Sequence, residues 1–410
     1  MSAFSSALRP AVALPEARGL LALAAATAVG ASGLAAGGTA SALLGAKLAG
    51  TDRLAGLGPG AVVIGSALGA VLLSRLSRRV GRGRSLAVGY LGGSVGAAVA
   101  VGSAATGSFA GLLAGCALCG VANAAVFLSR YAAAELSGGA GVGRAVGVVF
   151  FATALGAAAS PALLRPSAVV AEAAGLPRLS GLFLIAGVVF ALAGALVSRT
   201  AHGETETRSR PRGRAAALGL EAIARRDARL AVAVLGVSNL VMVGVMAIAP
   251  VRMTEHGMGL GLVGVLLSGH VAAMFAPSPL SGWIGDRFGP VATISLGLLL
   301  LVAAGGYGVL ASDDRAASIM PALALLGVGW NFGVVGGSTL LIRAVPHGER
   351  LDAEAIGEVA MSVAAAVAAP LAGVLVAFEG LGAIWAAAAA VALIALAAAA
   401  RAARVPASRS

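Results

Sequence analysis

Four side chains with soft metal-binding groups form two pairs in the second half of the sequence. Met242 and Met246 lie four residues apart in one apolar run, and His270 and Met274 lie four residues apart in the next. On a helix this spacing stacks both members of a pair on one face. Thioether and imidazole groups suit Cu(I), whereas oxygen-rich sets suit Mg²⁺, Ca²⁺ or Mn²⁺. The two pairs therefore predict a buried site for a soft metal ion.

Further soft ligands lie outside these two pairs. The turn between the two runs carries Met253, His256 and Met258, which we expect at the outer mouth of the protein, where capture of an incoming ion is one role open to them. An ordinary turn without a role is the alternative there. Cys116 and Cys119 lie three residues apart in an apolar run of the first half. They predict either a second relay site or two buried cysteines that act as small hydrophobic residues.

Each member of the central set also has a different interpretation. Methionine in a membrane helix is usually a packing residue. An ionisable side chain such as His270 is costly at mid-membrane and marks a functional position, but that position could carry protons rather than bind metal. Metal transport, proton coupling to another substrate, and packing therefore all remain open at the level of the residues.

The composition is that of an integral membrane protein. Of 410 residues, 59% are hydrophobic and 11% are charged, and the mean hydropathy is +0.95; soluble domains have about a quarter of their residues charged. The net charge of +12 comes from basic residues in short loops between apolar runs, which argues against a nucleic-acid partner. The first run is too long for a cleavable signal peptide. No phosphate-binding loop or catalytic triad is visible, so we expect neither an enzyme nor a cofactor.

Twelve apolar runs are long enough to span a bilayer, each with roughly 20 residues or more. The first six lie at about 19–47, 59–77, 86–106, 109–134, 145–165 and 179–198. The second six lie at about 230–251, 259–281, 290–311, 317–342, 354–377 and 380–400. The expected domains are a polar tail, a first half, a charge-rich linker, a second half and a basic tail, at 1–18, 19–198, 199–229, 230–400 and 401–410.

The sequence thus predicts an all-α membrane protein with twelve transmembrane helices in two six-helix pseudo-symmetric halves. Most of the 29 basic residues fall in the two tails, in the central linker and in alternate loops. The positive-inside rule places these segments in the cytoplasm, so both termini are expected there, with the protein in the cell membrane. We expect a monomer whose surroundings are membrane lipid.

The two halves are related by an internal repeat with a constant offset of about 208 residues. Gly81 corresponds to Gly289, and Asn123 corresponds to Asn331. Secondary transporters use such repeats to build a midplane site that can open to either side. We therefore expect Asn123, Trp330 and Asn331 beside a central cavity, with hydrogen bonding between helices as the simpler role of the asparagines.

The stretch from Gly282 to Gly289, G-W-I-G-D-R-F-G, resembles the G-x-x-x-D-R-x-G signature of the major facilitator superfamily. The resemblance implies a gate, in which Asp286 and Arg287 at a helix end form contacts in one state and lose them in another. The first-half copy departs from the pattern, because Arg78 stands where that family carries aspartate. Further interfacial or gate contacts are expected at Arg130, Tyr131, Glu354 and Glu358.

A narrower resemblance lies in the central set itself. Met242-x-x-x-Met246 followed by His270-x-x-x-Met274 is similar to the paired motif of CcoA-like copper importers of the same superfamily. It implies that copper is the transported substrate, that these four residues are its ligands, and that transport is directed into the cytoplasm. The alternative is proton-coupled efflux of a small organic compound with His270 as proton carrier. Drug antiporters, however, carry arginine and glutamine where this chain has Cys116 and Cys119. Uptake of an organic nutrient is a third possibility.

Overall fold

The computed structural model describes most of the chain and shows an all-helical protein. The described residues are 14–34, 40–51, 54, 56–139, 141–159, 163–200, 220–255, 257–311, 316–379 and 381–404. All elements within these ranges are helices. His256, most of the expected linker and both chain ends lie outside them.

The first half contains eight α-helices among its described residues. They are α2 (Leu14–Ser32), α3 (Ser41–Ala49), α4 (Leu57–Val80), α5 (Arg82–Thr106), α6 (Phe109–Leu136), α7 (Val142–Ala159), α8 (Leu164–Ala173) and α9 (Gly181–Thr200). Within the apolar run predicted at 19–47, α2 ends at Ser32 and α3 begins at Ser41. Residues 35–39, between them, lie outside the described residues. Helix α8 was not predicted; it is short, and it packs on α9.

The second half contains seven α-helices among its described residues. They are α10 (Arg226–Glu255), α11 (Leu260–Phe275), α12 (Ser278–Phe288), α13 (Pro290–Leu310), α14 (Ala316–Ala344), α15 (Arg350–Glu379) and α16 (Leu381–Arg404). Short 3-10 helices precede α9, α10 and α15, at Arg178–Ser180, Leu220–Ile223 and His347–Glu349. The stretch from Gly282 to Phe288, which lies beyond the predicted run at 259–281, forms the last turns of α12.

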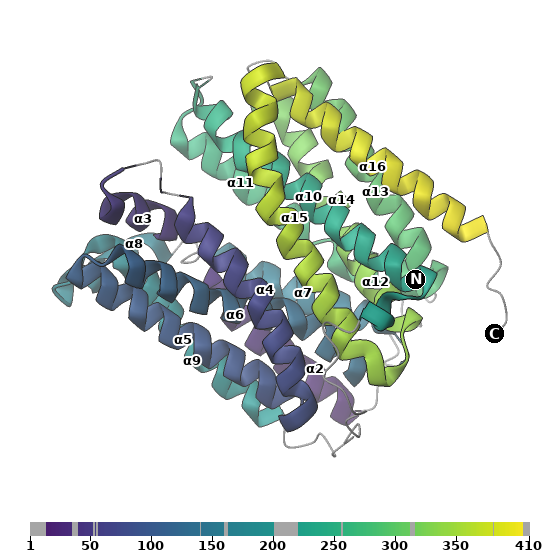
Figure 1. The fold of residues 1–410 in the computed structure, drawn as a ribbon, viewed down its shortest axis with the longest axis horizontal. Helices are drawn as coiled ribbons and strands as arrows, with labels where there is room; N and C mark the ends of the chain where they lie inside the picture. Colours follow the sequence, from purple (N-terminus) through teal and green to yellow (C-terminus); the bar gives the residue numbers. More distant parts are fainter. Residues whose placement is uncertain are drawn as a thin grey trace, which may run out of the picture.

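Twelve membrane-spanning segments account for this architecture. Ten segments among the described residues are long and apolar enough to cross a membrane, with α11 and α12 counted as one, and α2 and α7 are shorter apolar helices. Figure 1 shows the first-half helices as one group, in purple to blue, beside the second-half helices in green to yellow. The groups meet where α4 packs on α15 and α7 packs on α12. The predicted twelve-helix fold in two halves is confirmed.

The internal repeat is visible in the backbone. Gly81, between α4 and α5, has φ 88° and ψ 159°, and Gly289, between α12 and α13, has φ 92° and ψ 155°. Only glycine adopts this region readily. Since the two residues occupy corresponding positions, the same tight turn is built twice. We call the end of the bundle that carries both turns the basic end, because it also carries Arg78, Arg82 and Arg287.

The break between α11 and α12 brings polar side chains into the bundle. Pro277 lacks an N–H group and interrupts the helix. Ser278 Oγ donates to Phe275 O (2.6 Å), and Asn331 Nδ2 of α14 donates to Met274 O and to Ser278 Oγ (both 2.7 Å). Asn331 Oδ1 also accepts from Ser281 (2.7 Å). Neighbouring polar groups thus satisfy the carbonyls beside the proline, as is required inside a membrane.

Candidate functional site

His270 lies on α11 with one ring nitrogen bound and the other free. Its side chain is 1% exposed. Nδ1 lies 2.8 Å from Leu323 O of α14, and a carbonyl only accepts, so Nδ1 carries the hydrogen. Nε2 is buried without a hydrogen-bond partner. In the neutral ring Nε2 therefore holds an unused lone pair inside the bundle.

Met274 lies one turn further along α11 and is also buried. It is 8% exposed, and its carbonyl is held by Asn331 of α14. Helices α11 and α14 approach closely here: a Cβ added at Gly327 would lie only 2.8 Å from His270 O, and the absence of a side chain at Gly327 permits the contact. Both members of the second predicted pair are therefore fixed against α14.

Met242 and Met246 lie on α10 and are partly buried against the core. They share a helix face with Asn239, since the positions are three and seven residues apart. Asn239 Nδ2 donates to Met361 O of α15 (2.7 Å), and Asn239 Oδ1 accepts from Trp330 of α14 (3.2 Å). The first pair therefore lies on the side of α10 that faces α14 and α15.

The two predicted pairs have α14 as their common neighbour. Helix α10 packs mainly on α15 and α14, α11 packs mainly on α14, and direct contact between α10 and α11 is sparse. A fourth thioether, that of Met320, also lies in this region: a Cβ added at Gly269 would lie 3.3 Å from Met320 Sδ. Sequence reasoning missed Met320 because it lies one turn before Leu323 on a helix without a paired motif.

Of the predicted outer ligands, Met253 and Met258 are described. Met253 is 2% exposed, and its carbonyl accepts from the Met258 N–H (3.0 Å). The turn thus places Met253 inside the core, while Met258 is partly buried. His256 lies outside the described residues, so its part in ion capture stays a prediction.

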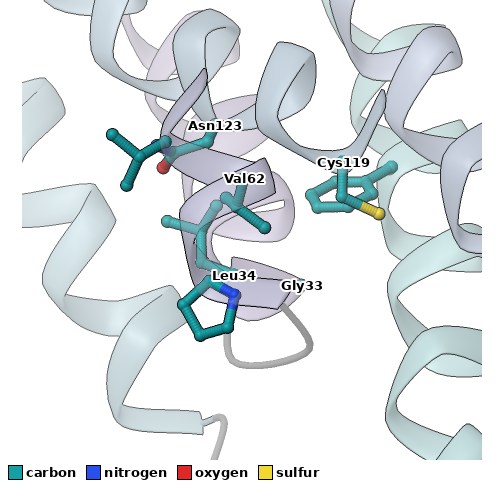
Figure 2. A pocket seen from close by; sticks show the side chains of 8 residues that line it. Gly33, Leu34, Val62, Cys119 and Asn123 are labelled. Atoms are coloured by element: carbon teal, nitrogen blue, oxygen red, sulfur yellow. The ribbon is translucent and has the colours of Figure 1, made fainter. Parts of the chain in front are cut away.

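Cys119 and Asn123 line a cavity of about 200 Å³ in the first half. The cavity lies between α2, α4, α6 and α9, and its other lining residues are Gly33, Leu34, Pro59, Val62, Val63 and Phe190. Figure 2 shows the Cys119 sulfur and the Asn123 amide in this cavity, with Val62 and Leu34 between them. Asn123 Nδ2 donates to Ser66 Oγ (3.1 Å). Cys116, one turn away, is fully buried and does not line the cavity.

An aromatic cluster lies where the halves meet. The rings of Phe150 (α7), Phe275 (α11) and Trp330 (α14) have centroids 5.5 to 6.0 Å apart, and Phe127 (α6) adds an edge contact at 6.3 Å to Phe150. Trp330 is 1% exposed. The cluster combines residues from four helices of both halves, and no spacing in the sequence signals it.

Asp286 connects α12 to the first half at the basic end. Its carboxylate accepts from the backbone N–H groups of Gly143 (2.9 Å) and Arg144 (3.0 Å) at the start of α7. The Arg144 side chain (3.3 Å) and Arg343 of α14 (3.0 Å) complete the contact. A carboxylate is favourable at a helix N-terminus. Arg287, which was expected to share this gate, is exposed.

The corresponding contact in the first half exists with its charges exchanged. Arg78 of α4 forms a two-pronged ion pair with Asp352 of α15. These residues correspond through the repeat to Asp286 and Arg144. The position of Asp286 is thus taken by the cation Arg78, and the position of Arg144 by the anion Asp352. The departure of Arg78 from the family pattern therefore retains the gate contact with reversed polarity.

Two more ion pairs join the halves near this end. Arg82 of α5 pairs with Glu135 of α6 (2.8 Å) and with Glu354 of α15 (2.8 Å), and its Nη2 donates to both carboxylates. Arg130 of α6 pairs with Glu358 of α15 and donates to Ser338 of α14 (2.8 Å). Since these contacts all lie toward the basic end, the halves are closed there.

The comparison with known proteins decides the family. The model of the Major Facilitator Superfamily matches residues 20–334 and 236–410. The chain belongs to this superfamily. It is a multi-pass membrane protein and a secondary transporter, not an enzyme, as predicted.

Relatives of similar length share this assignment. The chain is 31% identical over 358 residues to the uncharacterized transporter YddS of Bacillus subtilis (strain 168). The match covers 85% of this chain and 82% of that protein. It is 28% identical over 349 residues to the riboflavin transporter RfnT of Brucella anthropi. This match covers 82% of this chain and 84% of that protein.

Solved structures support the fold. The human organic anion transporter MFSD10 superposes with a TM-score of 0.76 at 17% identity, over 94% of this chain and 100% of that chain. A bacterial homologue of the iron transporter ferroportin, in an outward-facing state with soaked iron, superposes with a TM-score of 0.72 at 14% identity, over 94% and 99%.

Proposed function

We propose that this transporter imports copper, held as Cu(I) by Met242, Met246, His270 and Met274, by alternating access. The state of His270 carries the proposal. Its Nδ1 hydrogen is bound to a backbone carbonyl and its Nε2 is buried without a partner. Metal-bound histidines typically have this arrangement, in which the outer hydrogen bond orients the ring and the free nitrogen binds the metal.

The three methionines provide ligands of the matching softness. Thioethers select Cu(I) over hard cations, and helix α11, which carries His270 and Met274, contains no carboxylate residue. Because α10 and α11 touch sparsely in this state, an ion that binds both pairs would draw the two helices together around α14. Cargo binding would then favour a state in which α10 and α11 pack more closely.

We base the direction of transport on the resemblance, and the orientation of the closed end is compatible with it. With the basic residues on the cytoplasmic side, the closed end of the bundle faces the cytoplasm. Cargo would then enter from outside, which is the starting state of an importer. Copper import is also what the similarity of the paired motif to CcoA-like importers implies.

A second candidate is import of an aromatic organic nutrient such as a flavin. The cluster of Phe127, Phe150, Phe275 and Trp330 at the meeting point of the halves favours it, because such rings stack on planar compounds. The relative RfnT is named as a riboflavin transporter, which gives the candidate a specific compound to test.

Equilibrium binding to the purified full chain in detergent tests both candidates. Cu(I), buffered by a competing chelator under reducing conditions, is expected to bind wild type and the matched control His347→Ala, whose side chain is exposed at the basic end. His270→Ala is expected to lose this binding. Absence of Cu(I) binding in wild type, together with quenching of riboflavin fluorescence, would replace copper with a flavin. If wild type bound neither Cu(I) nor riboflavin, the remaining hypothesis would be proton-coupled efflux of a small organic compound with His270 as proton carrier.

A further inference from the structure

The ion pair between Arg130 and Glu358 joins the two halves inside the bundle rather than at its edge. Arg130 lies about 9 Å before the end of α6, and Glu358 about 12 Å after the start of α15. Their exposed fractions are 0% and 5%. Ionisable residues at such positions are costly in a membrane and generally serve ion or proton pathways.

Arg130 is anchored independently of Glu358. Its Nε donates to Ser338 (2.8 Å), one terminal nitrogen donates to Phe127 O (2.9 Å), and the other donates to Tyr131 Oη (3.0 Å). The guanidinium also lies 4.4 Å from the centre of the Tyr131 ring, a favourable cation–π distance. The cation therefore keeps Phe127 O and Tyr131, both on its own helix α6, when Glu358 and Ser338 of the second half leave.

Glu358 depends on Arg130 for its countercharge. Among the described residues, the helices packed on this part of α15 contribute no other cation to it: α10 and α14 present the neutral Asn239 and Ser338, and α4 presents Arg78 to Asp352. Glu354, one turn earlier on α15, is bound by Arg82. An ionised Glu358 separated from Arg130 would be an unpaired charge in the bundle, which is strongly unfavourable.

Alternating access requires that separation. Arg130 belongs to the first half and Glu358 to the second, and opening of the basic end moves the halves apart. The same motion releases Glu354 from Arg82, which keeps Glu135 of its own half, but Glu354 lies only about 6 Å after the start of α15, at the end that opens to water. Glu358 lies one turn deeper and has no second cation among the charged groups named above, and uptake of a proton removes its need for one.

We propose that Glu358 is the proton-binding carboxylate that couples transport to a proton gradient. Water on the side away from the basic end gives a proton to Glu358, so one O–H bond forms and the pair with Arg130 breaks. The basic end opens, the O–H bond breaks, and the proton leaves to water on that side. The carboxylate then pairs with Arg130 again and closes the end. One proton thus moves with the cargo, whatever the cargo is.

Infrared difference spectroscopy of the full chain in liposomes tests proton binding without any cargo. Acidification is expected to produce a carboxylic acid C=O band in wild type that is missing in Glu358→Gln. Glu354→Gln is the matched control, one turn away on the same helix, and should retain the band. A band that persists in Glu358→Gln, or that only Glu354→Gln removes, would overturn the assignment.

Flux measurements separate coupling from a purely structural role. In liposomes with acid outside, Cu(I) and riboflavin uptake are compared for wild type and Glu358→Gln. One pH unit should raise steady-state accumulation about tenfold for one coupled proton. Glu358→Gln should lose this response yet keep cargo exchange at equal pH, because the neutral amide mimics the protonated acid. If Glu358→Gln lost the response to the pH gradient and the exchange at equal pH to the same degree, the result would contradict coupling. Flux of neither cargo in wild type would reject the proposed functions and leave the spectroscopic result intact.

Discussion

One backbone carbonyl sets the orientation of the His270 ring and leaves Nε2 without a partner. The hydrogen bond to Leu323 fixes the ring, and the unpartnered Nε2 has a cost unless a ligand or an open state uses it. Metal ligation and proton transfer both use the same nitrogen. The methionines distinguish the two, because only a metal site needs their sulfur atoms.

Replacement of a single thioether should therefore separate copper from proton chemistry. Met242→Leu keeps the volume and apolarity of the side chain, and such swaps usually cost less than about 1.5 kcal/mol of stability. We expect Cu(I) affinity to fall at least about tenfold, a loss of about 1.4 kcal/mol in binding free energy. Chelator competition measures the affinity, and Ile248→Leu on the same helix is the control. Equal affinity in wild type and Met242→Leu would exclude Met242 as a ligand.

The two repeat-related asparagines give a second prediction at this scale. Asn331 makes three hydrogen bonds and satisfies Met274 O, whereas Asn123 has one hydrogen bond, to Ser66. Asn331→Ala should destabilise the protein by about 1–3 kcal/mol, the cost of a buried unsatisfied group. Asn123→Ala should cost less. Thermal unfolding in detergent measures both, and equal losses would contradict this ranking.

At the scale of elements, the two gates have opposite polarity. Asp286 reaches the N-terminus of α7 from the other half. In the matching contact, Arg78 reaches the first turn of α15, and α15 supplies its own anion in Asp352. Both arrangements put a carboxylate near a helix N-terminus, where it is stabilised. The electrostatic requirement is preserved although the residue types are exchanged.

A charge exchange tests this equivalence. Arg78→Asp places two carboxylates together and should weaken closure, while the added Asp352→Arg copies the Asp286–Arg144 arrangement and should restore it. Because both side chains are about one-third exposed, the pair contributes at most about 1 kcal/mol, or about a fivefold change in the closed-to-open ratio. Transport rate relative to wild type is the measurement. A double variant no better than Arg78→Asp would refute the equivalence.

The sequence predicted nearly all spanning helices, because unbroken apolar length is what the bilayer requires. Apolar length did not predict that α2 ends at Ser32, nor did it predict α8, which is too short for a span. The polarity reversal was also missed, because Arg78 was compared with the family pattern and not with Asp352, its partner 274 residues away. The aromatic cluster and Met320 depend on helix packing, which local spacing does not contain.

At the scale of the whole molecule, the closed basic end depends on a close approach of backbones. Gly282 of α12 lies against Gly143 of α7, and a methyl group added to either would overlap the other's carbonyl oxygen. Small residues permit such contact between membrane helices. The closed state therefore needs glycine at both positions.

Gly282→Val should shift the protein toward a state open at the basic end, with a cost to closure of about 1–3 kcal/mol from overpacking. Spin labels at the exposed positions Val80 and Phe288 report the separation of the halves. We expect the distance between the labels to be longer in Gly282→Val than in wild type. It should be unchanged in the control Gly264→Val, where an added Cβ meets no atom within 4 Å. An unchanged distance in Gly282→Val would show that this contact does not limit closure.

The central claim is copper import through the methionine–histidine site, and cellular copper content tests it most directly. Cells grown in copper-poor medium are compared without the protein, with wild type, and with Met242→Leu or His270→Ala at equal membrane levels. The account predicts copper accumulation with wild type that both substitutions abolish. Equal copper in all strains would contradict it.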